Sequence, residues 1–583
     1  MIEVYSYINK KESCGKVKKE NLDKVQIIEI ALFFISLALF GLFYEGTIAV
    51  ISLVYLILLI IRLMRSNEFV LPKNILLAGL GAIPLFALIT IPFAIDRGMA
   101  FFGGIKFIAV PVFILLMALE GQSFRNRLIR CIPIMAAVLT LIGLVSFFTP
   151  FKDFFFINHR FSGTFQYANA YALFLLIAVI ITFYENYKKP LTVVLTAVNF
   201  AGLLATGSRA VFVISFVSIL IMLIKERRRG RELIPFIVPC ACVLAAGAGV
   251  AYITDKADYF LRFLQMDIKS SSMIGRLIYD FDGLKIIARN PWGLGYKGYN
   301  FYQGSVQTAN YTVTYVHNEL LQTALDFGVV IAIAIAAGVI IEVIRKGPGT
   351  RNRIILIAMS IHCLFDWDMQ FVVMILILAL ISDYDKCLCL EINTGVRNVT
   401  LGIGAVMMAV LIWLGSAGIC EQFHNYKLAC RIYPGLTTSQ MRLVNGMDGT
   451  DYDMAEKICK HNKYCVVALQ AMAERNARLG DFVSMQKYGE MAVDAGRYNS
   501  SGYEIYIYFL SYAIDTCNSQ GDMQSTYNYV CDVAEIEKKI NKVKKETSKY
   551  AEYIYDSSDI KISSQYEQYI KDAQKLVENS GKE

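Results

Sequence analysis

Thirteen long apolar runs are the feature that most constrains how this chain can fold. A helix needs about 20 mostly apolar residues to cross a membrane, where its backbone groups find no water. The composition agrees, since 56% of the residues are hydrophobic and only 18% are charged. We therefore predict an all-α, polytopic membrane helix bundle of about 12 or 13 transmembrane helices. The predicted spans are Val25–Tyr44, Thr47–Met64, Asn74–Ile95, Ala100–Leu119, Ile129–Phe148, Tyr167–Tyr184, Leu191–Ala205, Ala210–Ile224, Leu233–Ile253, His317–Ile344, Ile354–Phe365, Phe371–Ile381 and Val399–Ile419.

The distribution of Lys and Arg predicts the orientation, because positively charged connections stay in the cytoplasm. We expect a multi-pass protein of the cell membrane with residues 1–24 in the cytoplasm and the C-terminus outside. The basic N-terminus precedes an apolar run that is too long for a signal-peptide core. The net charge of +8 is scattered between the runs, so no nucleic-acid partner is expected and membrane lipid is the surrounding medium. Basic clusters such as Arg227, Arg228 and Arg229 fill one set of alternate connections, whereas the other short set holds only Arg97, Lys152, Arg160 and Arg209.

Two polar segments are too long to be turns, and both fall on the external side. They divide the chain into a membrane domain, residues 25–419 with an external loop at 254–316, and a C-terminal extracytoplasmic domain, residues 420–583. The C-terminal segment alternates helix and turn signals, such as Leu479-Gly480-Asp481. A spacing near 34 residues suggests tetratricopeptide-like repeats, although the consensus is incomplete. We predict a soluble α-helical domain that docks a protein or acts as a spacer.

Six of the thirteen cysteines lie in this external region. An even number outside the cytoplasm permits disulfides, and reduced residues in helix cores fit equally well. Both interpretations stay open at this point. The six are Cys420, Cys430, Cys459, Cys465, Cys517 and Cys531.

His317, Asn318 and Glu319 stand where the polar external loop ends and the chain re-enters the membrane. A histidine at this water boundary can act as a general base, because its ordinary pKa of about 6.5 is near neutral pH. The alternative is a purely structural histidine.

Arg209 and Arg276 are cations at the external boundary. A planar guanidinium binds phosphate through two parallel hydrogen bonds, so an anionic ligand would explain both residues. The alternatives are contact of Arg209 with lipid headgroups and an i, i+4 ion pair between Arg276 and Asp280. Leu277, Phe281 and Leu284 share one face, which predicts an amphipathic helix on the membrane surface.

Aromatic and amide side chains crowd the same external loop. Tyr299 and Tyr315 are typical of sugar contacts and also of a membrane-interface belt. Two further segments reach this surface, one with Arg160 and Asn169 and one with His362 and Asp366, which are four residues apart and can pair. Asp366 and Asp368 lack the acidic companions of a divalent-cation site, so we expect no metal and no cofactor.

Several of these motifs together resemble the O-antigen ligase and O-antigen polymerase superfamily of bacterial membrane glycosyltransferases. The resemblance covers residues 25 to 420 and depends on the order and spacing of the motifs. They are Gly163-Thr164-Phe165 with Asn169, Thr206-Gly207-Ser208-Arg209, Gly275-Arg276, Pro291-Trp292-Gly293-Leu294-Gly295, and His317-Asn318-Glu319-Leu320-Leu321-Gln322 with Gly328.

The resemblance implies a C-type glycosyltransferase architecture and a glycan donor linked to polyprenyl pyrophosphate, used on the outer face of the cytoplasmic membrane. Arg209 and Arg276 would bind the donor pyrophosphate, and His317 would activate an acceptor hydroxyl in a metal-independent, inverting reaction. The supporting or acceptor-binding residues would be Arg160, Asn169, Tyr299, Tyr315, Asn318, Glu319 and Asp366.

The C-terminal domain is not part of the family pattern, so the acceptor stays open between glycan, peptidoglycan, lipid and protein. The enzyme is expected to be a glycan ligase in cell-surface polysaccharide assembly. The alternatives are a polysaccharide polymerase and a protein O-glycosylating oligosaccharyltransferase. A lipid-linked sugar flippase is less favoured, because the charged residues gather at one surface instead of along a route through the bilayer. A membrane anchor for the external domain would not need thirteen spans.

Overall fold

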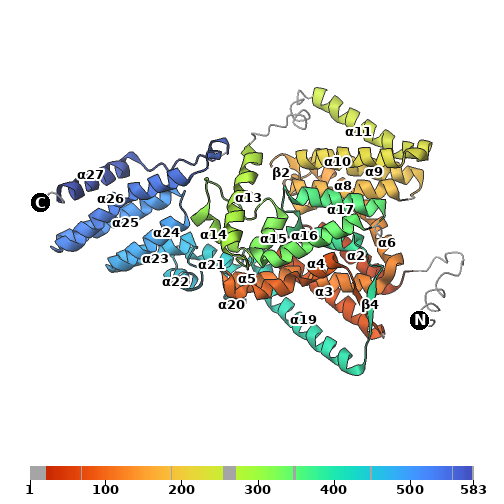
Figure 1. Ribbon diagram of the computed structural model, residues 1–583, viewed down its shortest axis with the longest axis horizontal. Helices are drawn as coiled ribbons and strands as arrows, with labels where there is room; N and C mark the ends of the chain where they lie inside the picture. Colours follow the sequence, from red (N-terminus) through yellow and green to blue (C-terminus); the bar gives the residue numbers. More distant parts are fainter. Residues whose placement is uncertain are drawn as a thin grey trace.

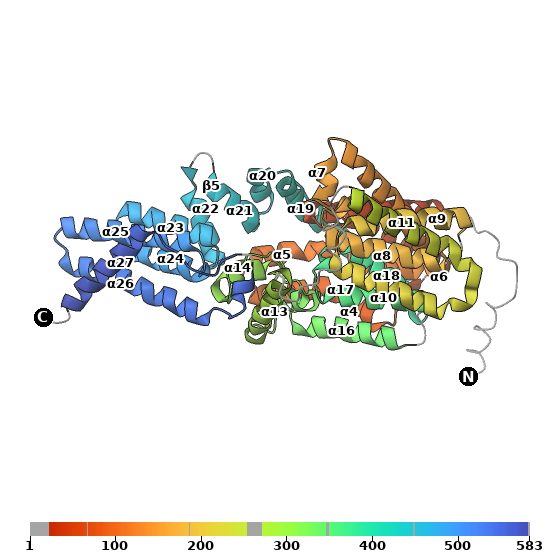
Figure 2. The same ribbon diagram turned by 90° about the horizontal axis from the view of Figure 1, so that it is seen from above.

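The chain is an elongated assembly of helices in which a membrane bundle and a C-terminal helical region lie at opposite ends of the long axis (Figure 1). The computed structural model describes residues 22–66, 68–185, 187–253, 271–345, 349–446, 449–554 and 556–580. The first part of the predicted external loop, 254–270, lies outside the described residues. Figure 2 shows the same two ends from above, with the loop helices and α5 between them.

The first half of the bundle consists of helices whose outward faces are apolar. Exposed Ile, Val, Leu and Phe side chains cover these faces, as expected for surfaces in contact with lipid. Helix α8 is the exception, since nearly all its residues are buried between its neighbours. The helices are α2 (Lys24–Ala38), α3 (Glu45–Arg65), α4 (Ile75–Ile89), α5 (Arg97–Gly103), α6 (Ala109–Val145), α7 (Lys152–Phe155), α8 (Ala168–Tyr184), α9 (Lys189–Ala205), α10 (Arg209–Lys225) and α11 (Ile234–Ile253), with short 3-10 turns η1 (Ile91–Phe93), η2 (Gly104–Phe107), η3 (Ser146–Phe148), η4 (Gly163–Phe165) and η5 (Arg227–Leu233).

The second half begins with the external loop and completes the bundle. Helix α18 is buried over its whole length, like α8. The elements are α13 (Ser271–Arg289) and α14 (Gly298–Val306) in the loop, then α15 (Glu319–Phe327), α16 (Val329–Ile344), α17 (Thr350–Cys363), η6 (Asp368–Gln370), α18 (Val372–Ile381) and α19 (Thr394–Gln422).

The structure confirms an all-α polytopic membrane bundle, and every predicted span falls on helical chain. Among the described residues, four helical segments are long and apolar enough to cross a membrane alone: Glu45–Arg65, Arg97–Phe148, Arg227–Gly249 and Thr394–Gln422. Shorter apolar helices make up much of the rest of the bundle. The number of spans and the orientation therefore stay predictions.

One predicted span is wrong in detail. His317–Ile344 is not a single helix, because α15 ends at Phe327 and α16 starts at Val329. Gly328 between them has φ +90°, and a Cβ there would lie 3.0 Å from the Trp292 carbonyl oxygen. Val329 donates its N–H to the Pro291 carbonyl oxygen at 2.9 Å. The turn at 291–295 thus fills the break, which explains why both motifs carry glycine.

The described residues form three short two-stranded sheets, of which one joins distant segments, although no strand was predicted. β1 (Glu68–Pro72) pairs with β4 (Cys387–Glu391). Asn158 and His159, both with positive φ, form the tight turn of a hairpin between β2 and β3. The remaining strands are β2 (Phe156–Ile157), β3 (Arg160–Phe161), β5 (Asn445–Gly446) and β6 (Gly449–Thr450).

The C-terminal region is helical, as predicted, and consecutive helices pack against each other. Aspartate side chains cap several of its helices, including Asp451, Asp481 and Asp522. All six cysteines from Cys420 onward are free, and Cys465 and Cys517 are buried in hydrophobic clusters between the helices. The elements are α20 (Tyr426–Ile432), α21 (Thr437–Val444), α22 (Tyr452–His461), α23 (Val466–Leu479), α24 (Phe482–Ala495), α25 (Ser500–Ser519), α26 (Met523–Glu546), η7 (Ala551–Tyr553) and α27 (Ser564–Ser580).

Candidate functional site

Asp366 is the centre of the candidate site. It lies in the turn between α17 and η6 and is fully buried. Its carboxylate accepts hydrogen bonds from the Tyr167 hydroxyl and from Asn169 Nδ2, each at 2.7 Å. Arg276 Nη2 lies 3.3 Å from Asp366 Oδ2 and forms an ion pair. Burial alone would raise the pKa of Asp366, but Arg276 and its other neighbours hold it below the ordinary value.

Arg160 extends this network away from Asp366. Its Nη2 donates to Asn169 Oδ1 at 2.7 Å, and its Nε donates to the Thr206 carbonyl oxygen at 2.9 Å. The hairpin between β2 and β3 sets the position of Arg160. Thr206 belongs to the tight turn that ends α9, and Arg209 is the first residue of α10. A chain of contacts therefore joins the turn before Arg209 to Arg276.

Arg276 comes from the external loop, on the first turns of α13. The predicted alternative, an intrahelical ion pair with Asp280, is not the contact that forms, because the guanidinium reaches Asp366 on the bundle instead. Its side chain is 21% exposed. Among the described residues its ion pair engages Nη2, so other guanidinium N–H groups can meet an anion.

His317 lies beside this ion pair. It precedes α15 by two residues, and Asn318 caps that helix by accepting from the Leu321 N–H at 3.2 Å. His317 Nδ1 is buried with no hydrogen-bond partner among the described residues. Burial lowers the pKa of His317 to about 4, with Asp366 raising it and Arg276 lowering it. The imidazole is therefore neutral near pH 7 and can accept a proton.

Asp280 is a second proton acceptor that the sequence did not single out. Burial raises its pKa to about 6, while Asn318 and Arg276 oppose the rise. Its Oδ1 is buried and has no hydrogen-bond partner among the described residues. Tyr279, the preceding residue, has its ring centroid 5.7 Å from that of His317. The sequence alone indicates Asp280 only as an ion-pair partner for Arg276, one helical turn away.

The two predicted aromatic residues, Tyr299 and Tyr315, are buried and pack against neighbouring side chains. Tyr299 is fully buried with Leu294, Val316 and Leu325, so its ring presents no face to a sugar. Tyr315 is also buried, with its ring centroid 5.4 Å from that of Trp367. Neither side chain is placed to stack on an acceptor.

His362 pairs with Asp368, and the predicted pairing with Asp366 is wrong. Nδ1 of His362 lies 2.5 Å from Asp368 Oδ2, and both side chains are fully buried. The chain turns at the end of α17, so Asp366 is no longer on the helix face that four-residue spacing assumes. Among the described residues, no group of three or more His, Cys, Asp and Glu side chains forms a candidate metal site.

A second buried charge network joins the external loop to the bundle, and the sequence did not predict it. Lys297 Nζ lies 2.8 Å from Glu45 Oε1 on α3, and Tyr296 donates its hydroxyl to the same oxygen at 2.5 Å. Lys106 is fully buried and donates to Gln370 Oε1 at 3.1 Å. The four rings around its ammonium group belong to Phe43, Phe107, Tyr296 and Tyr315.

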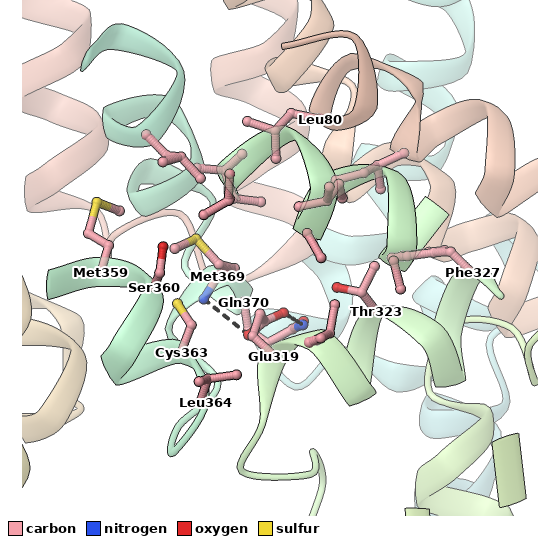
Figure 3. Close-up of a pocket in the computed structure, with 18 of the residues that line it drawn as sticks. Leu80, Glu319, Thr323, Phe327, Met359, Ser360, Cys363, Leu364, Met369 and Gln370 are labelled. Atoms are coloured by element: carbon pink, nitrogen blue, oxygen red, sulfur yellow. Dashed lines mark hydrogen bonds between the residues drawn. The ribbon is translucent and has the colours of Figure 1, made fainter. Parts of the chain in front are cut away.

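An apolar cavity of about 350 Å³ opens next to these networks, between α4, α15, α16, α17 and α18. Figure 3 shows Leu80, Phe327 and Met359 on its walls, with Glu319 and Gln370 at its polar end. Glu319 accepts from Gln370 Nε2 at 3.0 Å and from the Met369 N–H at 3.2 Å. Glu319 and Met369 therefore place the polar end of the cavity close to the segment that carries Asp366.

Comparison with protein families agrees with the motifs. Residues 191–336 match the family model described as O-antigen ligase. The matched segment runs from α9 into α16, so it includes Arg209, Arg276 and His317. No curated protein matches the chain.

The match therefore supports the resemblance to the O-antigen ligase superfamily over residues 191–336. The family supports a membrane glycosyltransferase-like function in polysaccharide assembly. Arg160, Asn169 and Asp366 lie outside the matched segment, and the fold brings them to it.

Proposed function

We propose that this protein is an O-antigen ligase-like glycosyltransferase. It transfers a glycan from a polyprenyl-pyrophosphate carrier to an acceptor hydroxyl on the outer face of the cytoplasmic membrane. The observation that carries the proposal is the convergence of Arg276, Asp366 and His317, which come from three separate segments of the chain.

Arg276 and Arg209 are the proposed diphosphate ligands. Asp366 fixes the guanidinium of Arg276 from one side, and an anion can approach the remaining N–H groups. A charge fixed in advance stabilises a leaving diphosphate without reorganisation at the moment of reaction. Arg209 stands at the start of α10, where the positive end of the helix also favours an anion.

His317 is the proposed general base. Its neutral imidazole takes the proton of the acceptor hydroxyl while the hydroxyl oxygen attacks the anomeric carbon. The bond between that carbon and the diphosphate oxygen breaks, and its electron pair leaves with the polyprenyl diphosphate. A single displacement of this kind inverts the anomeric configuration and needs no metal.

The cavity between α4 and α16–α18 is the proposed place for the isoprenoid chain next to the diphosphate. Its walls are apolar, and its polar end at Glu319 and Gln370 is close to the segment with Asp366. A hydrocarbon chain that leaves lipid for such a cavity keeps an apolar environment, whereas its diphosphate stays at the polar end.

The test uses the purified full chain in lipid nanodiscs with a polyprenyl-diphosphate-linked glycan and an acceptor. Polyprenyl diphosphate should be released only when the acceptor is present. Arg276→Ala should lower kcat/KM by about 100-fold, because one fixed donor to the leaving group is lost. Arg289→Ala is the matched control, since Arg289 is exposed at the other end of α13. Full activity of Arg276→Ala would overturn the proposed role of Arg276.

The acceptor decides between the related activities, so the same assay is run with separate acceptors. Transfer to a second lipid-linked repeat unit would define a polymerase, and transfer to a serine- or threonine-containing peptide would define protein O-glycosylation. Transfer to a lipid or peptidoglycan glycan is the result expected for a ligase.

A further inference from the structure

The C-terminal region contacts the same external loop that carries Arg276 and His317. Its described residues 548–554 and 556–558, between α26 and α27 and together called segment 548–558, reach α13 (Figure 1). Ala551 is buried in a cluster with Ile274 and Ile278, which flank Arg276 on α13, and Ile554 packs against this cluster. Each isoleucine is two positions from Arg276 in the chain, so the packing is local to the proposed diphosphate ligand.

Hydrogen bonds hold the same segment to loop residues 308–310. The Ser548 N–H donates to the Thr308 carbonyl oxygen at 2.7 Å. Asn310 donates its N–H to Ser558 Oγ and its Nδ2 to the Ser557 carbonyl oxygen, both at 2.9 Å. These three bonds join residues 308 and 310 to both ends of segment 548–558.

Thr308 connects this contact to α13, because it also forms hydrogen bonds to Asp282. The Thr308 N–H donates to Asp282 Oδ2 at 2.7 Å, and its hydroxyl donates to Oδ1 at 3.0 Å. Tyr311 donates its hydroxyl to the same carboxylate at 3.1 Å. Asp282 is buried, so these bonds to a charged acceptor are strong. Loop residues 308–311 thus lie between segment 548–558 and α13 and are bonded to both.

A second contact fixes the far side of the loop. The Arg497 N–H donates to the Gly304 carbonyl oxygen at 3.2 Å, and the rings of Tyr302 and Tyr464 are 4.9 Å apart. A Cβ on Gly304 would lie 2.3 Å from the Ala495 carbonyl oxygen, so α14 and α24 approach as closely as glycine allows. The external region therefore contacts both helices of the loop.

The opposite face of α13 is exposed. Leu277, Phe281 and Leu284 are each at least half exposed, and α13 otherwise contacts α15 of the bundle. The direction of α13 therefore depends on α15, on the loop residues that contact Asp282 and Ile286, and, near Arg276, on segment 548–558. Because Arg276 reaches Asp366 at 3.3 Å, a small tilt of α13 is enough to separate the two.

We propose that segment 548–558 is a positioning element for Arg276. The segment holds α13 in the direction that brings the guanidinium to Asp366 and to the donor diphosphate. This inference rests on the proposed function, and it goes further by making donor cleavage depend on the C-terminal region whichever acceptor is used. A domain that only docks an acceptor would leave donor binding unchanged when this contact is broken.

The experiment places a carboxylate in the contact by Ala551→Glu in the full chain. Val483→Glu is the matched control, because Val483 is an exposed residue of α24 away from α13. Ala551→Ser keeps a small side chain and should behave like the unmodified protein. Hydrogen–deuterium exchange reports on α13, and farnesyl diphosphate serves as the binding probe because it contains a prenyl diphosphate without a sugar.

Ala551→Glu should increase exchange in residues 271–289 while α8 and α23 keep their protection. Farnesyl diphosphate binding should weaken, and donor cleavage should fall by about 100-fold with every acceptor. Val483→Glu should change neither. The inference is overturned if Ala551→Glu leaves exchange in α13 and donor cleavage unchanged, or if it loosens α13 while cleavage is retained.

The result also separates this inference from the proposed function. If the unmodified protein cleaves no lipid diphosphate donor, the proposed function fails, whatever Ala551→Glu does to α13. If Arg276→Ala is inactive and Ala551→Glu is fully active, the proposed function stands and the positioning role of segment 548–558 is wrong.

Discussion

Two buried charge networks join the loop to the membrane bundle, and they differ in the hydrogen-bond donors that remain for a ligand. Around Asp366, the network ends in Arg276, a cation whose side chain is 21% exposed. Around Glu45, Lys297 is held close to the carboxylate, and the nearby Lys106 is fully buried among aromatic rings. The Lys297 side chain is itself 15% exposed, so the two networks differ mainly in their donors: Glu45 holds the compact ammonium group of Lys297, whereas the guanidinium of Arg276 keeps further N–H groups that can bind a ligand.

The backbone conformation also differs between the two networks. Lys297 adopts φ 59°, a left-handed conformation that is unfavourable for a residue with a side chain. The Glu45 contact offsets this strain and joins the 290–297 turn to α3. Arg276 lies on a regular helix whose direction depends on its neighbours. The first network is thus expected to affect chemistry and the second to affect folding.

The largest expected effect is on catalysis. His317→Ala should lower kcat by about 1,000-fold, because the proton of the acceptor hydroxyl loses its acceptor. The measurement is polyprenyl diphosphate release with saturating donor. His424→Ala is the control, since His424 is an exposed external histidine that contacts Tyr426. Activity within a few-fold of the unmodified protein would remove His317 from the mechanism.

Breaking the second network should act on stability. Lys297→Met leaves the buried Glu45 carboxylate without its cation, which should cost about 3 kcal/mol of unfolding free energy. Thermal unfolding in nanodiscs measures the loss, while donor cleavage per folded molecule should stay near normal. The comparison fails if Lys297→Met abolishes cleavage in protein that is still folded.

The pH dependence tests which group acts as the base. A base works when deprotonated, so a His317 with a pKa of about 4 predicts a rate that rises through pH 4 and is level from about pH 5 to 8. Below the pKa the rate should fall about tenfold for each pH unit. Asp280→Asn should leave this limb in place. A limb near pH 6 that disappears in Asp280→Asn would assign the base to Asp280 instead.

The smallest effect concerns the residues that hold Asp366. Asn169→Ala removes one hydrogen bond to Asp366 and one from Arg160, while the Tyr167 and Arg276 contacts remain. We expect about a fivefold fall in kcat/KM, equivalent to about 1 kcal/mol. Asn169→Asp should be worse than Asn169→Ala, because it places a second carboxylate against Asp366. The opposite order would contradict the placement of Asn169.

The sequence predicted the class of fold because each apolar run reports on its own local structure. It also placed Arg209 and His317 at the boundaries of such runs, and Arg276 on an amphipathic helix of the polar loop between them. It could not predict that Arg276 pairs with Asp366, because the two are 90 residues apart and the nearby Asp280 has ideal helical spacing. The break at Gly328 was missed for a similar reason, since apolar residues continue through it.

Buried residues that hold other residues of the site in place were the hardest to recognise in the sequence. Tyr167 lies at the start of an apolar run, and its bond to Asp366 spans 199 residues. Lys106 is a single charge inside a predicted span, where such a residue marks a buried partner, and that rule could have drawn attention to it. Glu45 falls in the short connection between two predicted spans, and nothing in the sequence marks Lys297, 252 positions away, as its partner.

The most direct test of the central claim is a structure of the full chain with farnesyl diphosphate bound. The account predicts diphosphate oxygens within about 3 Å of guanidinium nitrogens of Arg276 and Arg209, with His317 on the same side. The prenyl chain should enter the cavity between α4 and α16–α18. A diphosphate bound elsewhere, with Arg276 and Arg209 both out of contact, would contradict it.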